Sequence, residues 1–235
     1  RKIDLELLKR TNPIAFKIFM DLESDESLEE IFANLGQLKN TTDYNGLVAV
    51  HCEKKAIVEE KTEELKEKDE NTPIDYSYAR PAISEDESVS QAIELAGKNN
   101  LKLHICHLSS KKSLNLAENA SKTQPVSWEF TPHHLLMDNT AYDTYGTFIK
   151  TNPPLREKRD SITIDDLNYT SIIGTDHAPH TLEDKSKPQK FKVSRNGSVK
   201  TYTVTPLKVK DKKGNSSYVF GIGMKDKKYT GVKNA

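Results

Sequence analysis

Short apolar stretches alternate with helix-like stretches from residue 14 to residue 173, and this alternation limits the fold more than any other feature of the sequence. The apolar stretches have the length of buried strands, and the segments between them carry apolar residues at helical spacing. Strands that alternate with helices pair in parallel, in doubly wound sheets or in barrels. We therefore predict an α/β fold of the (β/α)8 TIM-barrel type. The expected strands are residues 14–20, 46–53, 101–107, 126–130 and 171–173.

Helices are expected between these strands. Ser24 suits the N-cap of the first helix, and Ser27 with Glu30 forms a capping-box pattern. Residues 71–81 are expected to be a loop. A complete barrel of this type takes about 250 residues, so the barrel is expected to be incomplete within residues 1–188. The predicted helices are residues 24–38, 53–68, 84–99 and 109–120.

Charge divides the chain into two parts. Residues 185–235 hold 14 Lys and Arg against 2 Asp and Glu, a net charge of +12. Residues 1–184 hold the other 21 Lys and Arg and 33 Asp and Glu, a net charge of −12, so the whole chain is neutral. We predict a domain boundary near Pro188, with the barrel in residues 1–188 and a basic, β-rich segment in residues 189–235. Alternating residues and Gly-containing turns predict strands in that segment. Its few aromatic residues alternate like core residues, so we expect no nucleic-acid partner.

Two cysteines, Cys52 and Cys106, are too few for a disulfide framework, and small buried hydrophobes are their simplest use. The sequence shows no signal peptide and no apolar run long enough to cross a membrane. We therefore expect a cytoplasmic protein with no membrane partner. The chain is only 35% hydrophobic, which is lean for a closed barrel.

Polar side chains follow or close the predicted strands, at Lys17, His51, His107, His134 and Asp176. The carboxyl ends of parallel barrel strands converge on one face, so these residues are expected to meet there. Imidazoles with a carboxylate suit zinc, which activates water at neutral pH. Simpler interpretations stay open at this point: a lone histidine is more often a core residue, and a strand-end lysine reaches out to water.

Six motifs in order resemble dihydroorotase, a member of the amidohydrolase superfamily. The Pro-His-His, Asn-Pro-Pro and Thr-Asp-His pieces are the specific ones, whereas the Phe-Lys-x-Phe and His-Cys-Glu pieces are shared more widely among cyclic amidohydrolases. The matching pieces are residues 16–20 (FKIFM), 51–53 (HCE), 104–109 (HICHLS), 129–135 (EFTPHHL), 152–156 (NPPLR) and 175–180 (TDHAPH).

The resemblance implies a zinc-dependent enzyme that interconverts carbamoyl-aspartate and dihydroorotate in pyrimidine synthesis, with one or two Zn²⁺ per chain. It implies that a carboxylated Lys17 bridges the metals and that His51 and His107 bind one of them. Asp176 is expected to bind the other and to act as general acid and base. The residues expected to contact substrate are Asn152, His180 and His134. Two further residues are weaker candidates for the site: His104, which competes with His107, and Glu129.

Two features depart from the family pattern. No His-x-His pair occurs in this sequence, although the superfamily's first strand carries one. Either residues upstream of Arg1 complete the site, or the chain is a remnant that cannot turn over substrate. The second departure is the tail, where residues 190–224 weakly resemble the later part of a PDZ domain of site-2-type proteases.

Three alternatives to the leading function stay open. One is a non-catalytic, dihydroorotase-like scaffold that partners aspartate transcarbamoylase. Another is a related allantoinase or hydantoinase, which shares the metal site and differs in its substrate contacts. A third is a binder of nucleic acid or anionic surfaces through the basic tail, for which core packing of the tail is the simpler account. A homo-oligomer is equally compatible with the sequence.

Overall fold

The computed structural model describes residues 13–168 and 171–176, and six strands between residues 189 and 232. The chain divides into two compact units, residues 1–176 and 177–235. The predicted boundary near Pro188 stays a prediction.

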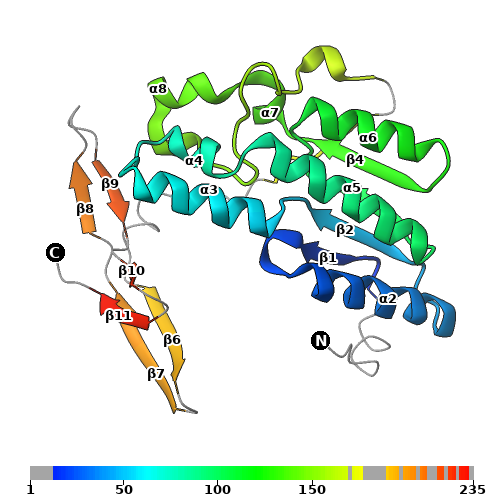
Figure 1. Cartoon of the computed structure of the whole chain (residues 1–235), viewed down its shortest axis with the longest axis horizontal. Coiled ribbons are helices and arrows are strands. Elements are labelled where there is room, and N and C mark those ends of the chain that lie inside the picture. Colours follow the sequence, from blue (N-terminus) through cyan, green and yellow to red (C-terminus); the bar gives the residue numbers. More distant parts are fainter. Residues whose placement is uncertain are drawn as a thin grey trace. The chain divides into compact units, whose positions relative to one another are not determined.

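A sheet of five parallel strands forms the first unit, in the order β1-β2-β3-β4-β5 (Figure 1). Sequence order and spatial order are the same, as in a (β/α) barrel. The predicted strands are confirmed, and most are shorter at their ends than expected. The strands are β1 (Phe16–Phe19), β2 (Leu47–His51), β3 (Lys102–Ile105), β4 (Val126–Phe130) and β5 (Ile172–Ile173).

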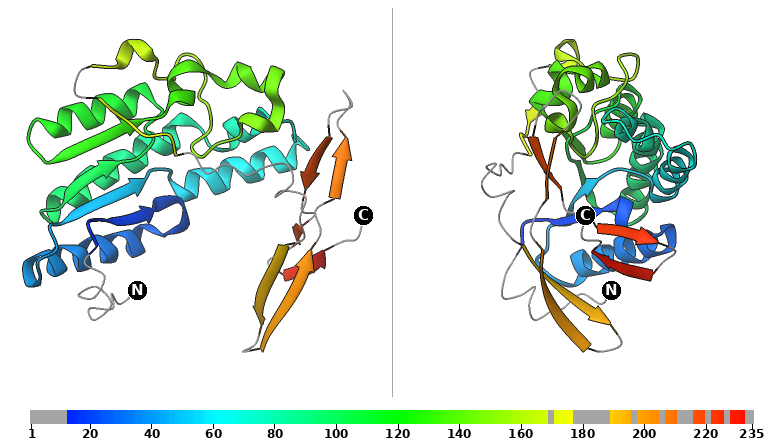
Figure 2. Two further views of the ribbon diagram at one scale, coloured as in Figure 1. Left: turned by 180° about the vertical axis from the view of Figure 1, so that it is seen from behind. Right: turned by 90° about the vertical axis from the view of Figure 1, so that its left-hand side faces the viewer.

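The connections between the strands are helical, and the major helices lie on one face of the sheet (Figure 2). Ser24 caps α2 as predicted, because its side chain accepts a hydrogen bond from the Ser27 backbone N–H at 3.2 Å. The first connections are η1 (Met20–Leu22), α2 (Asp25–Thr41), α3 (Lys55–Glu67), α4 (Asp75–Ala79), α5 (Ala82–Lys98) and α6 (Lys111–Ser121).

The short helix α4 lies in the segment that was expected to be a loop. Tertiary contacts outside this segment hold it, since the buried Ser77 hydroxyl donates to the Leu155 carbonyl at 2.6 Å. Local sequence carries no sign of that partner, which is 78 residues away. The prediction of a plain loop over residues 71–81 was therefore wrong.

Several short elements connect β4 to β5. They surround the segment from Lys150 to Arg156, which contains the Asn-Pro-Pro motif. These elements are α7 (Pro132–Leu136), η2 (Asn139–Ala141), α8 (Tyr142–Tyr145), η3 (Gly146–Ile149) and η4 (Ile164–Asp166).

The two faces of the sheet differ in burial. Alternate residues such as Val48, Val50, Leu103 and Ile105 point towards the helices and are at most 1% exposed. The opposite face, called the open face below, carries side chains that are partly or fully exposed. Strand register sets four of its members side by side, one from each of four strands: Lys17, Ala49, His104 and Ser127.

Strand β5 differs from its prediction. Its two isoleucines were expected to be buried, yet Ile172 and Ile173 are 44% and 51% exposed. Within the described residues this strand pairs only with β4, so nothing described covers its other side. The burial prediction was therefore wrong for this strand, although its position at the edge of a parallel sheet fits a partial barrel.

The described residues of the second unit form three antiparallel two-stranded pairs. This confirms the β-rich character expected of the tail, and the PDZ resemblance stays a prediction. The pairs are β6 (Gln189–Arg195) with β7 (Ser198–Val204), β8 (Leu207–Lys210) with β9 (Ser216–Val219), and β10 (Ile222–Lys225) with β11 (Lys228–Val232). Among the described residues, no helix is both long and apolar enough to cross a bilayer.

Candidate metal and substrate site

Two buried histidines meet at the carboxyl ends of neighbouring strands. His51 closes β2 and His107 follows β3, and His51 Nδ1 lies 3.3 Å from His107 Nε2. Two nitrogens that each bind a tetrahedral zinc at 2.0–2.1 Å are about 3.3 Å apart, so the pair already has the spacing of zinc ligands. Burial, then His51 and Lys17, lower the pKa of His107 to about 3, which keeps its imidazole neutral, as a metal ligand must be.

His107 reaches this position because the strand ends before it. Strand β3 stops at Ile105, and His107 adopts a positive φ of 38°, a conformation that non-glycine residues rarely take. The residues on either side are fixed, because the Cys106 N–H donates to the Val50 carbonyl and the Leu108 N–H to the Glu129 carbonyl. Strain of this kind gathers at functional sites. Because His107 lies beyond the end of β3, the in-and-out alternation of strand side chains does not determine where it points relative to His104.

Lys17 lies on the open face beside this pair. It is exposed on β1, and its ammonium lies 5.5 Å from the ring centre of Phe19. Burial raises the pKa of Cys106, and a hydrogen bond from Lys17 partly offsets that rise. The amine therefore lies near Cys106 and within electrostatic range of His107. Lys17 is compatible with its apolar strand because its side chain lies on the open face of the sheet, where it is exposed to water.

The far side of the His51 ring meets a buried group of charges. His51 Nε2 lies 2.7 Å from the Glu53 carboxylate, which is fully buried, and 3.8 Å from Asp21 Oδ1. Arg80 binds both acids, at 2.6 Å to Asp21 and 2.5 to 3.0 Å to Glu53. Burial opposes ionisation of Glu53, but the bonds from His51 and Arg80 outweigh it and lower its pKa to about 2.

Asp21, His51 and Glu53 have the donor types of a metal site, with their ligand atoms within 4.8 Å of one another. The Arg80 guanidinium already binds both carboxylates, however, and offsets part of their charge. A cation in that position competes directly with a metal ion. These residues therefore hold the Nε2 side of the His51 ring in place rather than binding a metal themselves.

A second set of ionic contacts lies behind His107. Arg156 donates to Glu85 at 2.8 Å and to the Ser109 hydroxyl at 2.8 Å, and it also donates to the Arg80 carbonyl. Glu85 accepts from the backbone N–H groups of Ser109 and Ser110, both at 3.0 Å. The chain just after His107 is thus tied to α5 and to the Asn-Pro-Pro segment. The four charged residues Glu53, Arg80, Glu85 and Arg156 are called the buried frame below.

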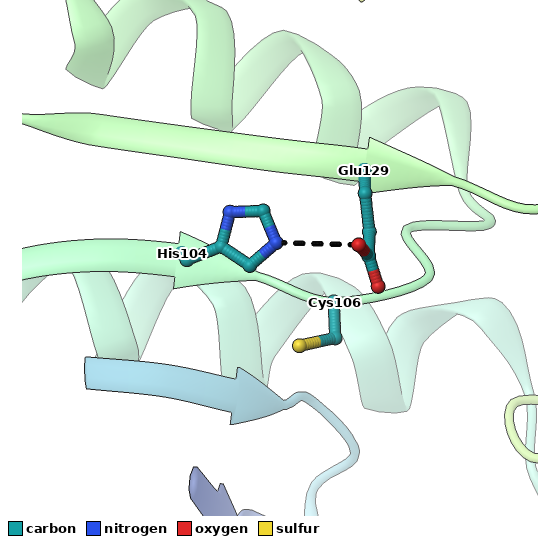
Figure 3. A group of neighbouring side chains, drawn as sticks. All are labelled: His104, Cys106 and Glu129. Atoms are coloured by element: carbon teal, nitrogen blue, oxygen red, sulfur yellow. Dashed lines mark ion pairs between the residues drawn. The ribbon is translucent and has the colours of Figure 1, made fainter. Parts of the chain in front are cut away.

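His104 and Glu129 form a separate group on the open face with Cys106 (Figure 3). His104 Nε2 lies 3.5 Å from Glu129 Oε2, and His104 Nδ1 lies 2.9 Å from the Ser127 hydroxyl. These residues also offer metal-binding atoms, but the Lys17 amine already lies against the Cys106 thiol. The structure thus separates the two histidines of the motif, placing His107 with His51 and His104 with Glu129.

Asp176 follows β5 in a conformation that also has a positive φ, of 47°, and it is exposed. Gly174, two residues earlier, leaves room for the Glu129 carboxylate, which would stand 2.5 Å from a Cβ at that position. Burial lowers the pKa of His133 while the charge of Asp176 opposes the change, so this carboxylate lies within electrostatic range of His133. The structure therefore brings Asp176 to the strand ends, as predicted.

His134 is placed differently from its predicted role. It is 3% exposed, and both of its ring nitrogens are engaged, with the Thr131 hydroxyl at 2.7 Å and the Pro153 carbonyl at 3.0 Å. Burial lowers its pKa well below the ordinary value, so the ring is neutral. This geometry makes His134 a support for the Asn-Pro-Pro segment, and it leaves neither ring nitrogen free for substrate.

Asn152, by contrast, is exposed. The hydroxyl of Tyr76, on α4, donates to its side-chain oxygen, and the Lys150 ammonium lies 3.9 Å from the Tyr76 ring centre. The oriented amide of Asn152 keeps its N–H groups for another partner. His180, expected to bind substrate, lies outside the described residues.

Sequence reasoning missed Tyr76, Arg80 and Glu85. Each acts through a partner distant in sequence, such as Arg80 with Glu53 at 27 residues and Arg156 with Glu85 at 71. No local periodicity signals such pairs. The unusual burial of charged residues becomes visible only when the fold is known.

No family model matches the chain. Curated relatives do match it. The dihydroorotase of Methanosphaera stadtmanae is 45% identical over 177 residues, covering 74% of this chain and 40% of the relative. The dihydroorotase of Methanothermobacter thermautotrophicus is 40% identical over 184 residues, covering 78% and 41%. The chain is homologous to part of the dihydroorotases.

Weaker similarity extends to neighbouring activities. The allantoinase of Salmonella gallinarum is 27% identical over 192 residues. Among solved structures, a D-hydantoinase from Thermus sp. superimposes with a TM-score of 0.63 at 26% identity, covering 72% of this chain and 38% of that one. The fold is therefore that of the amidohydrolase barrel, and the chain spans about two fifths of the length of the dihydroorotases it matches. Amidohydrolases are in general metal-dependent, and the described residues include candidate metal-binding groups.

Proposed function

We propose that this chain contributes to a dihydroorotase, an enzyme that interconverts N-carbamoyl-L-aspartate and dihydroorotate by closing and hydrolysing a cyclic amide. The observation that carries the proposal is the His51–His107 pair, whose nitrogens lie 3.3 Å apart at the strand ends of a barrel homologous to dihydroorotases. The spacing and the neutral state of His107 fit a divalent metal.

The metal ligands in this proposal are His51, His107, Asp176 and a carboxylated Lys17. Zinc is the proposed ion, since it favours imidazole and carboxylate ligands. When bound, the metal supplies Lewis-acid activation of water and of the amide carbonyl. Carboxylation would turn the exposed Lys17 amine into an anionic oxygen ligand next to the histidine pair.

The chain's own residues supply proton transfer and substrate orientation. In the hydrolytic direction, water oxygen adds to the amide carbon, the ring C–N bond breaks, and the nitrogen leaves with a proton. Asp176 accepts a proton from the attacking water and delivers it to the departing nitrogen. Asn152 binds substrate through the amide N–H groups that Tyr76 leaves free, and His180 pairs with the substrate carboxylate.

The decisive experiment measures the conversion of dihydroorotate by the purified protein and by its Asp176→Asn variant. We expect kcat to fall by about 10² or more, because general acid–base catalysis contributes 10²–10⁴-fold. Circular dichroism should show an unchanged fold, since Asp176 is exposed. Asp165→Asn, an exposed carboxylate on η4, is the matched control and should leave kcat unchanged. Retained activity in Asp176→Asn would contradict the assignment.

A substrate panel with allantoin and a hydantoin separates the neighbouring activities, which the 27% identical allantoinases represent. A purified protein that binds no metal and turns over none of the three substrates would favour the scaffold alternative, with aspartate transcarbamoylase as the partner to test. The cytoplasm and pyrimidine synthesis are the compartment and pathway that go with the dihydroorotase proposal.

A further inference from the structure

We propose that Glu53 is the positioning residue of the metal centre: it fixes His51 in the tautomer that carries its proton on Nε2 and so directs the Nδ1 lone pair at the metal. Arg80 holds Glu53 in place for this task. The inference rests on the proposed metal centre, and it adds two residues that contact neither metal nor substrate.

A hydrogen bond joins the His51 ring to the Glu53 carboxylate. His51 Nε2 and the Glu53 carboxylate are 2.7 Å apart, the distance of a charge-assisted bond. An ionised carboxylate only accepts hydrogen bonds, so Nε2 must be the donor. In the neutral ring the other nitrogen, Nδ1, then carries a lone pair, and that lone pair faces His107 Nε2 at 3.3 Å.

Arg80 holds the Glu53 side chain rigidly. Its side chain is fully buried, and the Arg80 guanidinium meets both of its oxygens, with Nε at 3.0 Å from each and Nη2 at 2.5 Å from one. The same Nη2 also binds Asp21 at 2.6 Å, so the guanidinium cannot turn without losing bonds to both acids. A carboxylate held in this way offers the His51 ring one fixed acceptor.

The opposite ring orientation of His51 is disfavoured. Rotation of the ring by 180° would turn its Nε2–H away from Glu53, whose carboxylate would keep only its bonds from Arg80. Losing a buried hydrogen bond to a charged acceptor is costly, so Glu53 selects the ring orientation as well as the tautomer. Partners that orient a ligating histidine in this manner typically change metal affinity 10- to 100-fold when mutated.

The test compares wild-type chain, Glu53→Gln and Glu87→Gln. Glutamine keeps the shape of Glu53 but loses its charge and one acceptor oxygen, so it no longer fixes the proton on His51 Nε2. Glu87 is exposed on α5, so Glu87→Gln is a matched control that removes one carboxylate away from His51. Zn²⁺ affinity is measured by competition with a chromophoric chelator, and the His51 tautomer by long-range ¹H–¹⁵N NMR of the metal-free protein.

We expect the wild-type and Glu87→Gln proteins to show the Nε2–H tautomer and equal Zn²⁺ affinity. Glu53→Gln should lose this tautomer and bind Zn²⁺ 10- to 100-fold more weakly. A role in folding alone would lower stability without changing the tautomer. If Glu53→Gln does not fold, Arg80→Lys takes its place, because lysine keeps the charge and loses the planar fork; the same changes, smaller in size, are expected.

An Nδ1–H tautomer in the wild-type protein, or unchanged Zn²⁺ affinity in a folded Glu53→Gln variant, would overturn the inference. Failure of the wild-type protein to bind Zn²⁺ is a different result. It would remove the metal centre of the proposed function, while the tautomer in the metal-free protein would still decide whether Glu53 controls His51.

Discussion

The buried frame and the open face carry similar kinds of polar residues in opposite surroundings. The frame is made of charges that are at most 2% exposed or, for Arg80, mostly buried, and each charge is paired at hydrogen-bonding distance. On the open face, His104 and Glu129 are about one fifth exposed and 3.5 Å apart. The frame has little freedom to move, whereas the open face can rearrange.

This difference indicates a division of labour. A buried, fully paired charge resists displacement, because a lost partner leaves it without water or counter-charge. A partly exposed pair with long contacts, such as His104 with Glu129, contributes less to stability, since solvent screens it. The frame is therefore suited to hold His51 and His107 at a fixed separation, and the open face is suited to contact molecules that come and go.

The strongest test of the contrast compares one broken pair from each region. Arg156→Met should lower the free energy of unfolding by about 3–5 kcal/mol, because it leaves Glu85 buried and unpaired. Glu129→Gln on the open face should cost about 1 kcal/mol or less. Urea denaturation followed by circular dichroism measures both. Equal losses in the two variants would show that the regions do not differ in this way.

Metal affinity sharpens the same contrast. His107→Ala removes a proposed ligand and should weaken Zn²⁺ binding by about 100-fold or more, beyond the effect of outer partners. His104→Ala, three residues away, should change affinity by less than about 10-fold, since His104 lies with Glu129. Chelator competition measures both constants. A larger loss in His104→Ala would move the metal to the open-face group.

The pH dependence of stability follows from His107 and Glu53, whose pH windows overlap. The folded pKa of His107 is about 3 against an ordinary 6.5, so the unfolded chain binds the extra proton, and stability falls by about 2 kcal/mol between pH 7 and pH 5 in the metal-free protein and continues to fall towards pH 3. Glu53, with a folded pKa of about 2, adds its loss below about pH 4.5. Urea titrations across pH measure this slope, and His107→Gln should remove the loss between pH 7 and pH 5 while leaving the Glu53 contribution below about pH 4.5.

The smallest expected effect concerns Gly174. A Cβ there would stand 2.5 Å from the carboxylate of Glu129, the flexible end of a side chain that can move aside. Gly174→Ala should therefore cost about 1 kcal/mol in stability and should shift the NMR signals of His104 through its partner. The signals of His51 should stay in place. Movement of His51 would show that the open face and the frame are coupled.

Sequence alone predicted the order of the strands and the cap of α2, because apolar periodicity and N-cap chemistry are local. It placed Lys17 at the end of its strand, whereas Lys17 is the second residue of β1. It left the choice between His104 and His107 open, and that choice depended on where β3 ends. It misassigned His134, whose ring nitrogens bond to Thr131 and Pro153. It gave no role to Arg80, because ion pairs between distant segments leave no pattern along the chain.

The left-handed backbone at His107 and Asp176 has a consequence for anyone redesigning this fold. Glycine adopts such conformations without steric cost, so an algorithm that optimises stability on this backbone would tend to place glycine at both positions. The resulting sequences would keep the barrel and erase the chemistry. A non-glycine residue that keeps a strained, positive-φ conformation where glycine would be more stable therefore indicates selection for activity.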